Sequence, residues 1–397
     1  MSLKIKDTIE WVGKIDWELR KFHGEELSTA HGSSYNSFLI KDENNILIDT
    51  VWSPYAGEFL KNLAKTIDIR SINGIIACHA EPDHSGALPY LISMMPDVPV
   101  YCTANGQKSL YGYYHQNWNF NIVKTGMRVN IGSRELLFIE APMLHWPDTM
   151  MCFLTGDNIL FSNDIFGQHY ASNFLFNDLV PQEELSYEAL KYYANIISPF
   201  NKKVIGKLAE LDTLNLVIDM ICPAHGVIWR DKPTSIIEKY KKWAGDYSEN
   251  QITIIYDTMY NSTRRMAEAI AEGIKLADQK VFIKLFNSSR EDKSNIITEI
   301  FQSKGIIIGA PTINNGLTGS IYALLEELKL LNLSNKKGGA FGSYGWSPTS
   351  IILINEKLKE ANFEVIGEGI KSQWSPDETK LDECKNYGFE FANYFNS

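Results

Sequence analysis

The last part of the chain alternates short apolar segments with amphipathic segments, and this pattern constrains the fold more than any other feature. The apolar segments, which are candidate strands, are residues 252–256, 281–286, 305–309, 338–342 and 364–367. Between the first two, Met266, Ala267, Ile270 and Ile274 recur at helical spacing and form an apolar stripe. Strands that alternate with helices in this way build a parallel sheet. The pattern therefore predicts a doubly wound, five-stranded parallel sheet with helices on both faces.

The first 249 residues show a different pattern, in which short strands are more frequent than helices. Residues 36–40 and 45–49 flank a turn-like Asp-Glu-Asn sequence, as in a hairpin. Further candidate strands are residues 74–78, 98–102, 136–141, 150–154 and 159–162. Sheets with intervening helices favour a sandwich covered by helices. The pattern changes over residues 243–250, so we expect two domains, at residues 1–249 and 250–397, which suits the length of the chain.

Composition excludes several classes of function. The formal net charge of −10 argues against nucleic-acid binding, because contact with phosphates needs a basic surface. No apolar run reaches the roughly 20 residues that cross a bilayer, and the first residues lack the apolar segment of a secretory signal. We therefore expect a cytoplasmic protein without a membrane segment. The five cysteines form no C-x-x-C pair, which excludes rubredoxin-type iron, zinc ribbons and thioredoxin-like chemistry.

The strongest chemical signal is the run His79-Ala80-Glu81-Pro82-Asp83-His84, at the end of the candidate strand 74–78. In extended backbone the first two potential ligands point one way, while the last two can turn toward a second ion. Three more potential ligands follow later apolar segments, namely His145, Asp164 and His225. Each alone has an ordinary explanation, since a single loop histidine is usually not a ligand and Asp164 could cap a turn. Four histidines and three carboxylates at successive strand ends together predict a binuclear metal site.

The order and spacing of these residues resemble the metallo-β-lactamase-like superfamily over about residues 30–230, which implies an αββα sandwich. The hydrolases of that superfamily have a second histidine where this chain has Glu81. A carboxylate is a harder, anionic ligand than imidazole, and with Asp83 and Asp164 it brings three negative charges to the site. This charge favours iron that changes its oxidation state over zinc, which has no redox chemistry.

A second candidate site lies in the alternating part of the chain, where the run Thr258–Thr263 follows a strand and leads into a helix. Hydroxyl groups and free backbone N–H groups at a helix N-terminus form an anion site, although N-capping explains such a run about as well. The run has no glycine and no Lys-[ST] ending, which argues against a nucleoside-triphosphate loop.

Two more loops follow the third and fourth strands, near the carboxyl ends where sheets of this kind bind ligands. The three loops resemble the FMN-binding loops of flavodoxins. The candidate FMN-binding residues are Thr258, Met259, Tyr260, Asn261, Ser262, Thr263, Pro311, Thr312, Ile313, Asn314, Asn315, Ser343, Tyr344, Gly345 and Trp346.

A lactamase-like domain with H-x-E-x-D-H, fused to a flavodoxin domain, resembles the flavodiiron protein family (A-type flavoproteins) over nearly the whole chain. The resemblance implies two non-haem irons and FMN as cofactors. By that resemblance one iron is bound by His79, Glu81 and His145, the other by Asp83, His84 and His225, and Asp164 bridges them. It also implies reduction of O₂ to water, of NO to N₂O, or of both. Asn261 stands where the family often has glycine, but asparagine tolerates positive φ better than most residues.

The resemblance also implies partners. The sequence shows no rubredoxin or flavin-reductase module after the flavodoxin-like part, so we expect an external electron donor such as rubredoxin or a flavin reductase. Members of the family form head-to-tail homodimers, and we expect a homodimer or a dimer of dimers here. His169 is a candidate proton donor beside the metal pair, or equally a surface or capping histidine.

Two alternative functions, from other classes of protein, remain compatible with the sequence. A binuclear zinc hydrolase with a flavodoxin-like appendage would hydrolyse esters or lactams and have no redox role. A pure electron carrier would use the lactamase-like domain only as a scaffold. Glu81 and the FMN loops count against the first, and the ordered set of potential ligands counts against the second.

Overall fold

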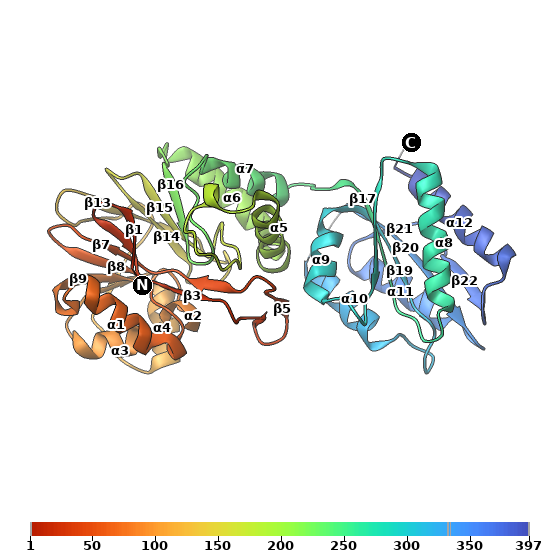
Figure 1. The fold of residues 1–397 in the computed structure, drawn as a ribbon, viewed down its shortest axis with the longest axis horizontal. Helices are drawn as coiled ribbons and strands as arrows, with labels where there is room; N and C mark the ends of the chain where they lie inside the picture. The colour runs from red at the N-terminus through yellow and green to blue at the C-terminus, as the bar shows by residue number, and fades with distance from the viewer. Residues whose placement is uncertain (1, 332, 334, 396–397) are drawn as a thin grey trace. The chain divides into compact units, whose positions relative to one another are not determined.

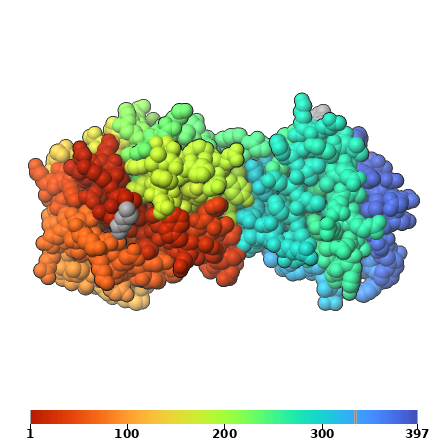
Figure 2. Space-filling model, in the orientation of Figure 1, coloured from red at the N-terminus to blue at the C-terminus, as the bar shows by residue number. Residues whose placement is uncertain are grey.

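The computed structural model describes residues 2–331, 333 and 335–395 of the chain. The chain folds into two units, Met1–Phe22 with Thr29–Ala244, and His23–Ser28 with Gly245–Ser397. Apart from His23–Ser28, the first unit is coloured from red to green and the second from cyan to blue in Figure 1 and Figure 2. The domain division that we expect at residues 249 and 250 stays a prediction.

The first unit contains two main sheets. The larger sheet has the order β1-β2-β7-β8-β9-β10-β11, with β1 (Leu3–Lys6), β2 (Ile9–Trp11), β7 (Phe38–Ile40), β8 (Asn45–Ile48), β9 (Ile72–Ile76), β10 (Val100–Cys102) and β11 (Phe120–Ile122). The smaller sheet has the order β12-β13-β14-β15-β16, with β12 (Arg128–Asn130), β13 (Glu135–Glu140), β14 (Met150–Leu154), β15 (Ile159–Asn163) and β16 (Met220–Pro223). Short ribbons join β3 (Lys14–Asp16) to β6 (Ser33–Tyr35) and β4 (Lys21–Phe22) to β5 (Leu27–Ser28).

Alternation of side chains along the strands creates the two apolar layers of this unit. Leu47 of β8 packs in a cluster with Phe59 of α1 (Ala56–Thr66) and Leu91 of α3 (Leu88–Met94). Its neighbours Ile46 and Ile48 belong to the other cluster, which lies between the sheets. The helix α4 (Ala104–Tyr114) also covers the larger sheet, while α5 (Gln182–Tyr192), α6 (Asn201–Thr213) and α7 (Thr234–Ala244) lie beside β14–β16 (Figure 1). The predicted αββα sandwich is confirmed.

A nearly buried ion cluster joins a turn of one sheet to a turn of the other. The Arg134 guanidinium lies 2.7 Å from Asp42 and 2.5 Å from Asp157. Burial raises the pKa of Asp42, but hydrogen bonds from the Ser133 backbone and from Arg134 more than offset this and lower it to about 2. We therefore expect Asp42→Asn to lower the free energy of unfolding by about 1–3 kcal/mol near neutral pH.

The pH dependence of this effect has a defined sign. The pKa of Asp42 in the folded chain, about 2, lies below its ordinary value of 3.8, so the folded state binds fewer protons between the two. The stabilisation is fully present above about pH 4 and is lost as the pH falls through about 2. Urea unfolding of the wild type and Asp42→Asn should give a difference that shrinks on acidification. A difference that stays constant from neutral pH down to about pH 2.5 would contradict this assignment.

The second unit contains a parallel sheet with the order β18-β17-β19-β20-β21. Its strands are β17 (Glu249–Tyr256), β18 (Phe282–Asn287), β19 (Ser303–Gly309), β20 (Lys337–Tyr344), β21 (Glu364–Val365) and β22 (Ile370–Gln373). The sequence predicts five strands, but the last one is interrupted, and β21 and β22 pair separately with β20. The reason is local, because Gly367 and Gly369 adopt φ of 66° and 87°, outside the strand region.

Helices cover both faces of this sheet. On one face lie α8 (Ser262–Ala277) and α12 (Glu378–Asn393), and Met266, Ile270 and Phe391 of these helices belong to one buried cluster with Ile254 of β17. The others are α9 (Lys293–Gln302), α10 (Gly319–Leu331) and α11 (Thr349–Glu360). The predicted doubly wound, flavodoxin-like architecture is confirmed. Across the described part of the chain no helix is both long and apolar enough to span a membrane.

Candidate metal centre and flavin loops

The sequence-predicted metal ligands come from loops at the ends of four strands of the first unit. The run that begins at His79 follows β9 and leads into the short helix α2 (Pro82–Ser85), which carries Asp83 and His84. His145 lies in the loop between β13 and β14. Asp164 and His225 follow β15 and β16, which pair in parallel, so their carboxyl ends meet. The larger sheet therefore supplies one side of the site and the smaller sheet the other.

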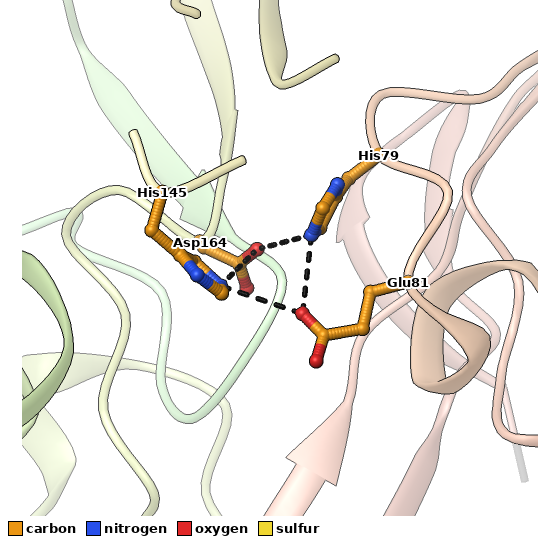
Figure 3. Close-up of side chains that lie close together, drawn as sticks. All are labelled: His79, Glu81, His145 and Asp164. Atoms are coloured by element: carbon orange, nitrogen blue, oxygen red, sulfur yellow. Dashed lines mark hydrogen bonds and ion pairs between the residues drawn. The ribbon is translucent and has the colours of Figure 1, made fainter. Parts of the chain in front are cut away.

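Four of these side chains converge on one point (Figure 3). His79 Nε2 lies 3.1 Å from Glu81 Oε2 and 3.6 Å from Asp164 Oδ2. His145 Nε2 lies 3.4 Å from the same Glu81 oxygen and 3.6 Å from the same Asp164 oxygen. Donor atoms about 2.1 Å from one ion are separated by about 3.0–3.4 Å in octahedral or tetrahedral geometry, close to these distances.

The other three predicted ligands form a second group against the opposite oxygen of the same aspartate. His84 Nε2 lies 3.1 Å from Asp164 Oδ1 and 3.3 Å from Asp83 Oδ2. His225 Nε2 lies 3.5 Å from Asp164 Oδ1 and 3.2 Å from Asp83 Oδ2. Asp164 thus presents one carboxylate oxygen to each group, which is the arrangement of a bridging ligand.

Burial without hydrogen bonds shows that these residues fit a pair of cations. Among the residues that the structure describes, no hydrogen-bond partner exists for either oxygen of Asp83, either ring nitrogen of His84, or Asp164 Oδ2. Leaving buried polar atoms unsatisfied costs about 1–3 kcal/mol each, and more for charged groups. Metal ions at the two convergence points would satisfy Asp83 Oδ2, His84 Nε2 and Asp164 Oδ2, the atoms that face those points.

The electrostatics of the cluster favour positive charge. Burial lowers the pKa of His79, but Asp148 and Glu81 more than offset this and raise it to about 10. The pKa of His84 is likewise about 10, because Asp83 and Asp164 outweigh burial. Burial raises the pKa of Asp164, yet the surrounding histidines hold it well below its ordinary value. Carboxylates that attract protons this strongly also attract metal cations.

Two residues at this site were missed by sequence reasoning. Asp148 accepts hydrogen bonds from the Ala80 N–H at 2.7 Å and lies 3.2 Å from His79 Nδ1. The Tyr192 hydroxyl donates to Asp164 Oδ1 at 3.2 Å. Asp148 stands three residues after His145 and could have been suspected from that spacing. No local signal marks Tyr192, which α5 brings to the site from 28 residues away.

His169 lies beside the second group. Its Nδ1 is 2.7 Å from the Ser33 hydroxyl, and its ring centroid is 4.8 Å from that of His225 and 5.1 Å from that of Tyr192. The side chain is buried, so the alternative of a surface histidine is wrong. Its place is compatible with the predicted proton donor, which stays a prediction.

The first candidate flavin loop lies between β17 and the start of α8. Asn261 adopts φ of 64° and caps α8 without a side-chain hydrogen bond, which leaves the first backbone N–H groups of the helix for a ligand. Within the described residues the buried Thr258 hydroxyl oxygen has no hydrogen-bond partner. A hydroxyl and free N–H groups at a helix N-terminus fit the phosphate of FMN.

The two other predicted loops lie at the same end of the sheet and are bonded to the first. Thr263 Oγ1 lies 3.0 Å from Ser343 Oγ, and the Thr312 N–H donates to the Ser343 carbonyl oxygen at 3.0 Å. These bonds bring together the segments 258–263, 311–315 and 343–346. Tyr260 and Trp346 expose 89% and 82% of their surface, which is unusual for large aromatic residues and leaves ring faces available for a flat ligand.

A fourth segment at this edge was missed by sequence reasoning. Trp374 directly follows β22, its N–H donates to the Tyr344 carbonyl oxygen at 2.7 Å, and 65% of its surface is exposed. A Cβ atom on Gly345 would lie 2.9 Å from the Trp374 ring, so only glycine permits this approach without a shift. The interruption of the last strand hid this residue, because the fifth strand was expected to end at residue 367.

We expect Trp374→Ala to weaken the binding of FMN by about 2- to 10-fold, because a stacked aromatic contact contributes about 0.5–1.5 kcal/mol. Flavin fluorescence titration measures this. The binding of riboflavin, which has the ring but no phosphate, should be weakened to the same extent. Trp17→Ala removes a similarly exposed tryptophan of the first unit and serves as the matched control. Unchanged affinity for both flavins in Trp374→Ala would rule out contact with the ring.

The fold and the sites together define a redox protein that combines two adjoining groups of potential metal ligands with a flavodoxin-type flavin unit. A family model described as ODP family beta lactamase matches residues 34–226, and the flavodoxin model matches residues 254–388. The anaerobic nitric oxide reductase flavorubredoxin of Escherichia coli is 50% identical over 99% of this chain and 82% of its own length.

Two solved structures extend this likeness. The rubredoxin oxygen:oxidoreductase of Desulfovibrio gigas superposes with a TM-score of 0.96 at 35% identity, covering 100% of this chain and 99% of its own. The flavodiiron protein of Giardia intestinalis gives a TM-score of 0.95 at 31% identity, covering 99% and 96%.

The chain belongs to the flavodiiron protein family. It is a flavodiiron oxidoreductase whose cofactors are FMN and a non-haem di-iron pair. The prediction of an FMN- and di-iron-dependent reductase of O₂ or NO is confirmed at the level of the class. The findings do not support a binuclear zinc hydrolase.

Proposed function

We propose that His79, Glu81 and His145 hold one iron, that Asp83, His84 and His225 hold the other, and that Asp164 bridges them. The observation that carries this assignment is the placement of Asp164, with Oδ2 at 3.6 Å from His79 Nε2 and Oδ1 at 3.1 Å from His84 Nε2. The complete donor set is nitrogen from four histidines and oxygen from three carboxylates. Such a set suits iron that cycles between oxidation states better than zinc.

We propose NO and O₂ as substrates. When bound, the reduced flavin and the ferrous pair would each supply two electrons, and four electrons convert O₂ to two waters while two convert two NO to N₂O and water. The Escherichia coli relative is named a nitric oxide reductase and the Desulfovibrio gigas relative an oxygen oxidoreductase. Of these two relatives, the one with the higher identity is the one named a nitric oxide reductase, so NO is the first gas to test.

Both reactions consume protons, and Tyr192 and His169 are the two side chains that we propose to hold and supply them. Burial raises the pKa of Tyr192 well above its ordinary value, so its hydroxyl keeps its proton and donates it toward Asp164. His169 lies against Tyr192 and hydrogen-bonds with Ser33. We propose that Tyr192 keeps a proton at the bridging carboxylate through its hydrogen bond, and that His169 supplies protons that the reaction consumes.

FMN is proposed to bind at the edge of the second unit. The segment Thr258–Thr263 would hold the phosphate at the α8 N-terminus. Pro311, Thr312, Ile313, Asn314 and Asn315, with Ser343, Tyr344, Gly345 and Trp346, would contact the rest of the cofactor. Trp374 is added to this set because it packs on Gly345.

Electrons are proposed to come from a separate donor. A rubredoxin-type donor is in keeping with the names of the relatives, and a flavin reductase is the alternative. We further propose a head-to-tail homodimer, or a dimer of dimers, in which the flavin of one protomer serves the metal pair of the other. A cytoplasmic location is proposed with these.

Anaerobic rapid mixing tests the function directly. Fully reduced protein, loaded with iron and FMN, is mixed with O₂ and separately with NO at matched concentrations, and reoxidation of the flavin is followed. We expect reoxidation by at least one gas to be much faster than for free reduced FMN, with N₂O formed when NO is consumed. Reoxidation by neither gas faster than free reduced FMN would contradict the proposed function.

A further inference from the structure

The outer nitrogens of the proposed ligand histidines have unequal partners. His79 Nδ1 faces the Asp148 carboxylate at 3.2 Å, whereas His225 Nδ1 faces the neutral carbonyl oxygen of Ser34 at 2.7 Å. His84 Nδ1 has no hydrogen-bond partner in the described part of the chain. One of the two metal positions is therefore backed by a full negative charge, and the other by a backbone dipole.

The Asp148 carboxylate is fixed in this place. Its Oδ2 also accepts the Ala80 N–H at 2.7 Å, and its side chain is completely buried. The Thr103 hydroxyl donates to the Asp148 carbonyl oxygen at 3.1 Å, which holds the backbone. The Trp146 ring meets the His79 ring edge-on, with centroids 5.0 Å apart. The imidazole is thus held between a carboxylate and an indole, with its Nε2 directed at the metal position.

A carboxylate behind an imidazole changes the metal that the imidazole binds. The carboxylate accepts a hydrogen bond from the Nδ1 proton, which makes Nε2 a more basic metal ligand and fixes the orientation of the ring. Added negative charge and a stronger donor both stabilise the ferric state more than the ferrous state. A backbone carbonyl does the same more weakly, because it carries only a partial charge.

The other buried carboxylate near the site, Asp49, acts differently. Its oxygens accept from the Cys78 N–H at 2.8 Å and from Asn163 Nδ2 at 3.3 Å, so its hydrogen bonds go to groups other than a ligand ring. It interacts electrostatically with His84, on the side of the second metal position. Burial in addition disfavours its charged form. Asp49 therefore offsets the effect of Asp148 only in part.

We propose that Asp148 makes the two metal positions unequal, so that the position of His79, Glu81 and His145 retains ferric iron while the position of Asp83, His84 and His225 is reduced first. Asp148 is in this sense a positioning residue. The proposal rests on the ligand assignment above. Its consequence is that a single electron arriving at the oxidised pair always resides on the same metal, which gives a defined half-reduced state.

A reductive titration tests this. The wild type and Asp148→Asn, both loaded with iron and FMN, are titrated anaerobically while the mixed-valence signal is followed by electron paramagnetic resonance. Asparagine keeps the size and an acceptor oxygen but removes the charge. We expect the equilibrium constant for forming the half-reduced pair from the fully oxidised and fully reduced pairs to fall about 10-fold in the variant. This narrows the difference between the reduction potentials of the two metals by about 59 mV. The metal that is reduced last should account for the change.

Asp49→Asn and Asp148→Glu are the matched variants. Removal of the Asp49 charge should widen the difference between the two reduction potentials or leave it unchanged, because that charge acts on the metal that is reduced first. Asp148→Glu retains the charge and should keep a separation close to that of the wild type. The proposal would be overturned if Asp49→Asn narrowed the difference between the two reduction potentials as much as Asp148→Asn does. It would also be overturned if Asp148→Glu abolished that difference. Circular dichroism confirms that each variant is folded.

Iron analysis separates the two levels of inference. Wild-type protein that fails to bind two irons per chain would contradict the proposed function itself. Wild-type protein with two irons, whose half-reduced state is unaffected by Asp148→Asn, would overturn only the inequality of the two positions.

Discussion

Asp164→Ala is expected to lower the iron content from two ions per chain to less than one. Each proposed group of ligands faces one oxygen of this carboxylate, so its removal leaves each group with fewer donor atoms and less negative charge. Loss of one partner from a buried charged network costs about 3–5 kcal/mol, which corresponds to roughly a 10²–10⁴-fold loss of metal affinity. Gas-dependent flavin reoxidation should fall with the iron. Iron analysis and rapid mixing measure the two effects.

Two other variants make this result specific. Asp83 belongs to the second group, where it faces His84 and His225, so Asp83→Ala should remove one iron and leave the other. Asp178 pairs with Arg230 at the surface, and Asp178→Asn should keep two irons and full activity. If Asp164→Ala retained two irons with activity near that of the wild type, the bridging role would be wrong.

Thr258→Asp is expected to prevent the binding of FMN. The variant places a carboxylate in the loop that leads into α8, where the phosphate is proposed to lie. Two like charges about 4 Å apart repel by about 4 kcal/mol at the effective dielectric of a protein surface, which weakens binding by about 10²–10³-fold. Fluorescence titration with FMN gives the dissociation constant. Without flavin, the iron-loaded variant should also show no donor-driven turnover.

The matched ligand for this variant is riboflavin, which lacks the phosphate. In Thr258→Asp the affinity for riboflavin should change far less than the affinity for FMN. Trp374→Ala should instead weaken the binding of both ligands equally. Thr258→Val removes only the hydroxyl and should weaken FMN about 10-fold, the effect of one charge-assisted hydrogen bond. Equal losses for FMN and riboflavin in Thr258→Asp would mean that the loop does not hold the phosphate.

Much of the fold was predictable because periodic burial is a local property. The segments 150–154 and 159–162 coincide with β14 and all but the last residue of β15. The alternation after residue 251 gave the parallel sheet. Short strands such as β11 and β12 were missed, because three residues with partial exposure carry no clear period. The interrupted last strand was missed because two glycines in the left-handed region break it.

The sequence by itself determined the chemistry of the metal centre. The residue types in the run from His79 to His84, with three donors further along, indicate two cations and favour iron. This is possible because ligand chemistry depends on the side chain itself, and because a short loop keeps its donors together whatever the rest of the chain does.

Only the tertiary structure decided how these donors are shared and supported. The packing of β9 against β15 and β16 places one Asp164 oxygen at each group of ligands. The loop between β13 and β14 brings Asp148 to His79 across 69 residues, and α5 brings Tyr192 to Asp164 across 28. Contacts of this kind are set by how distant elements pack, and the side chains that make them carry no local signature. The inequality of the two metal positions is therefore a property of the fold, whereas the metals themselves are a property of the sequence.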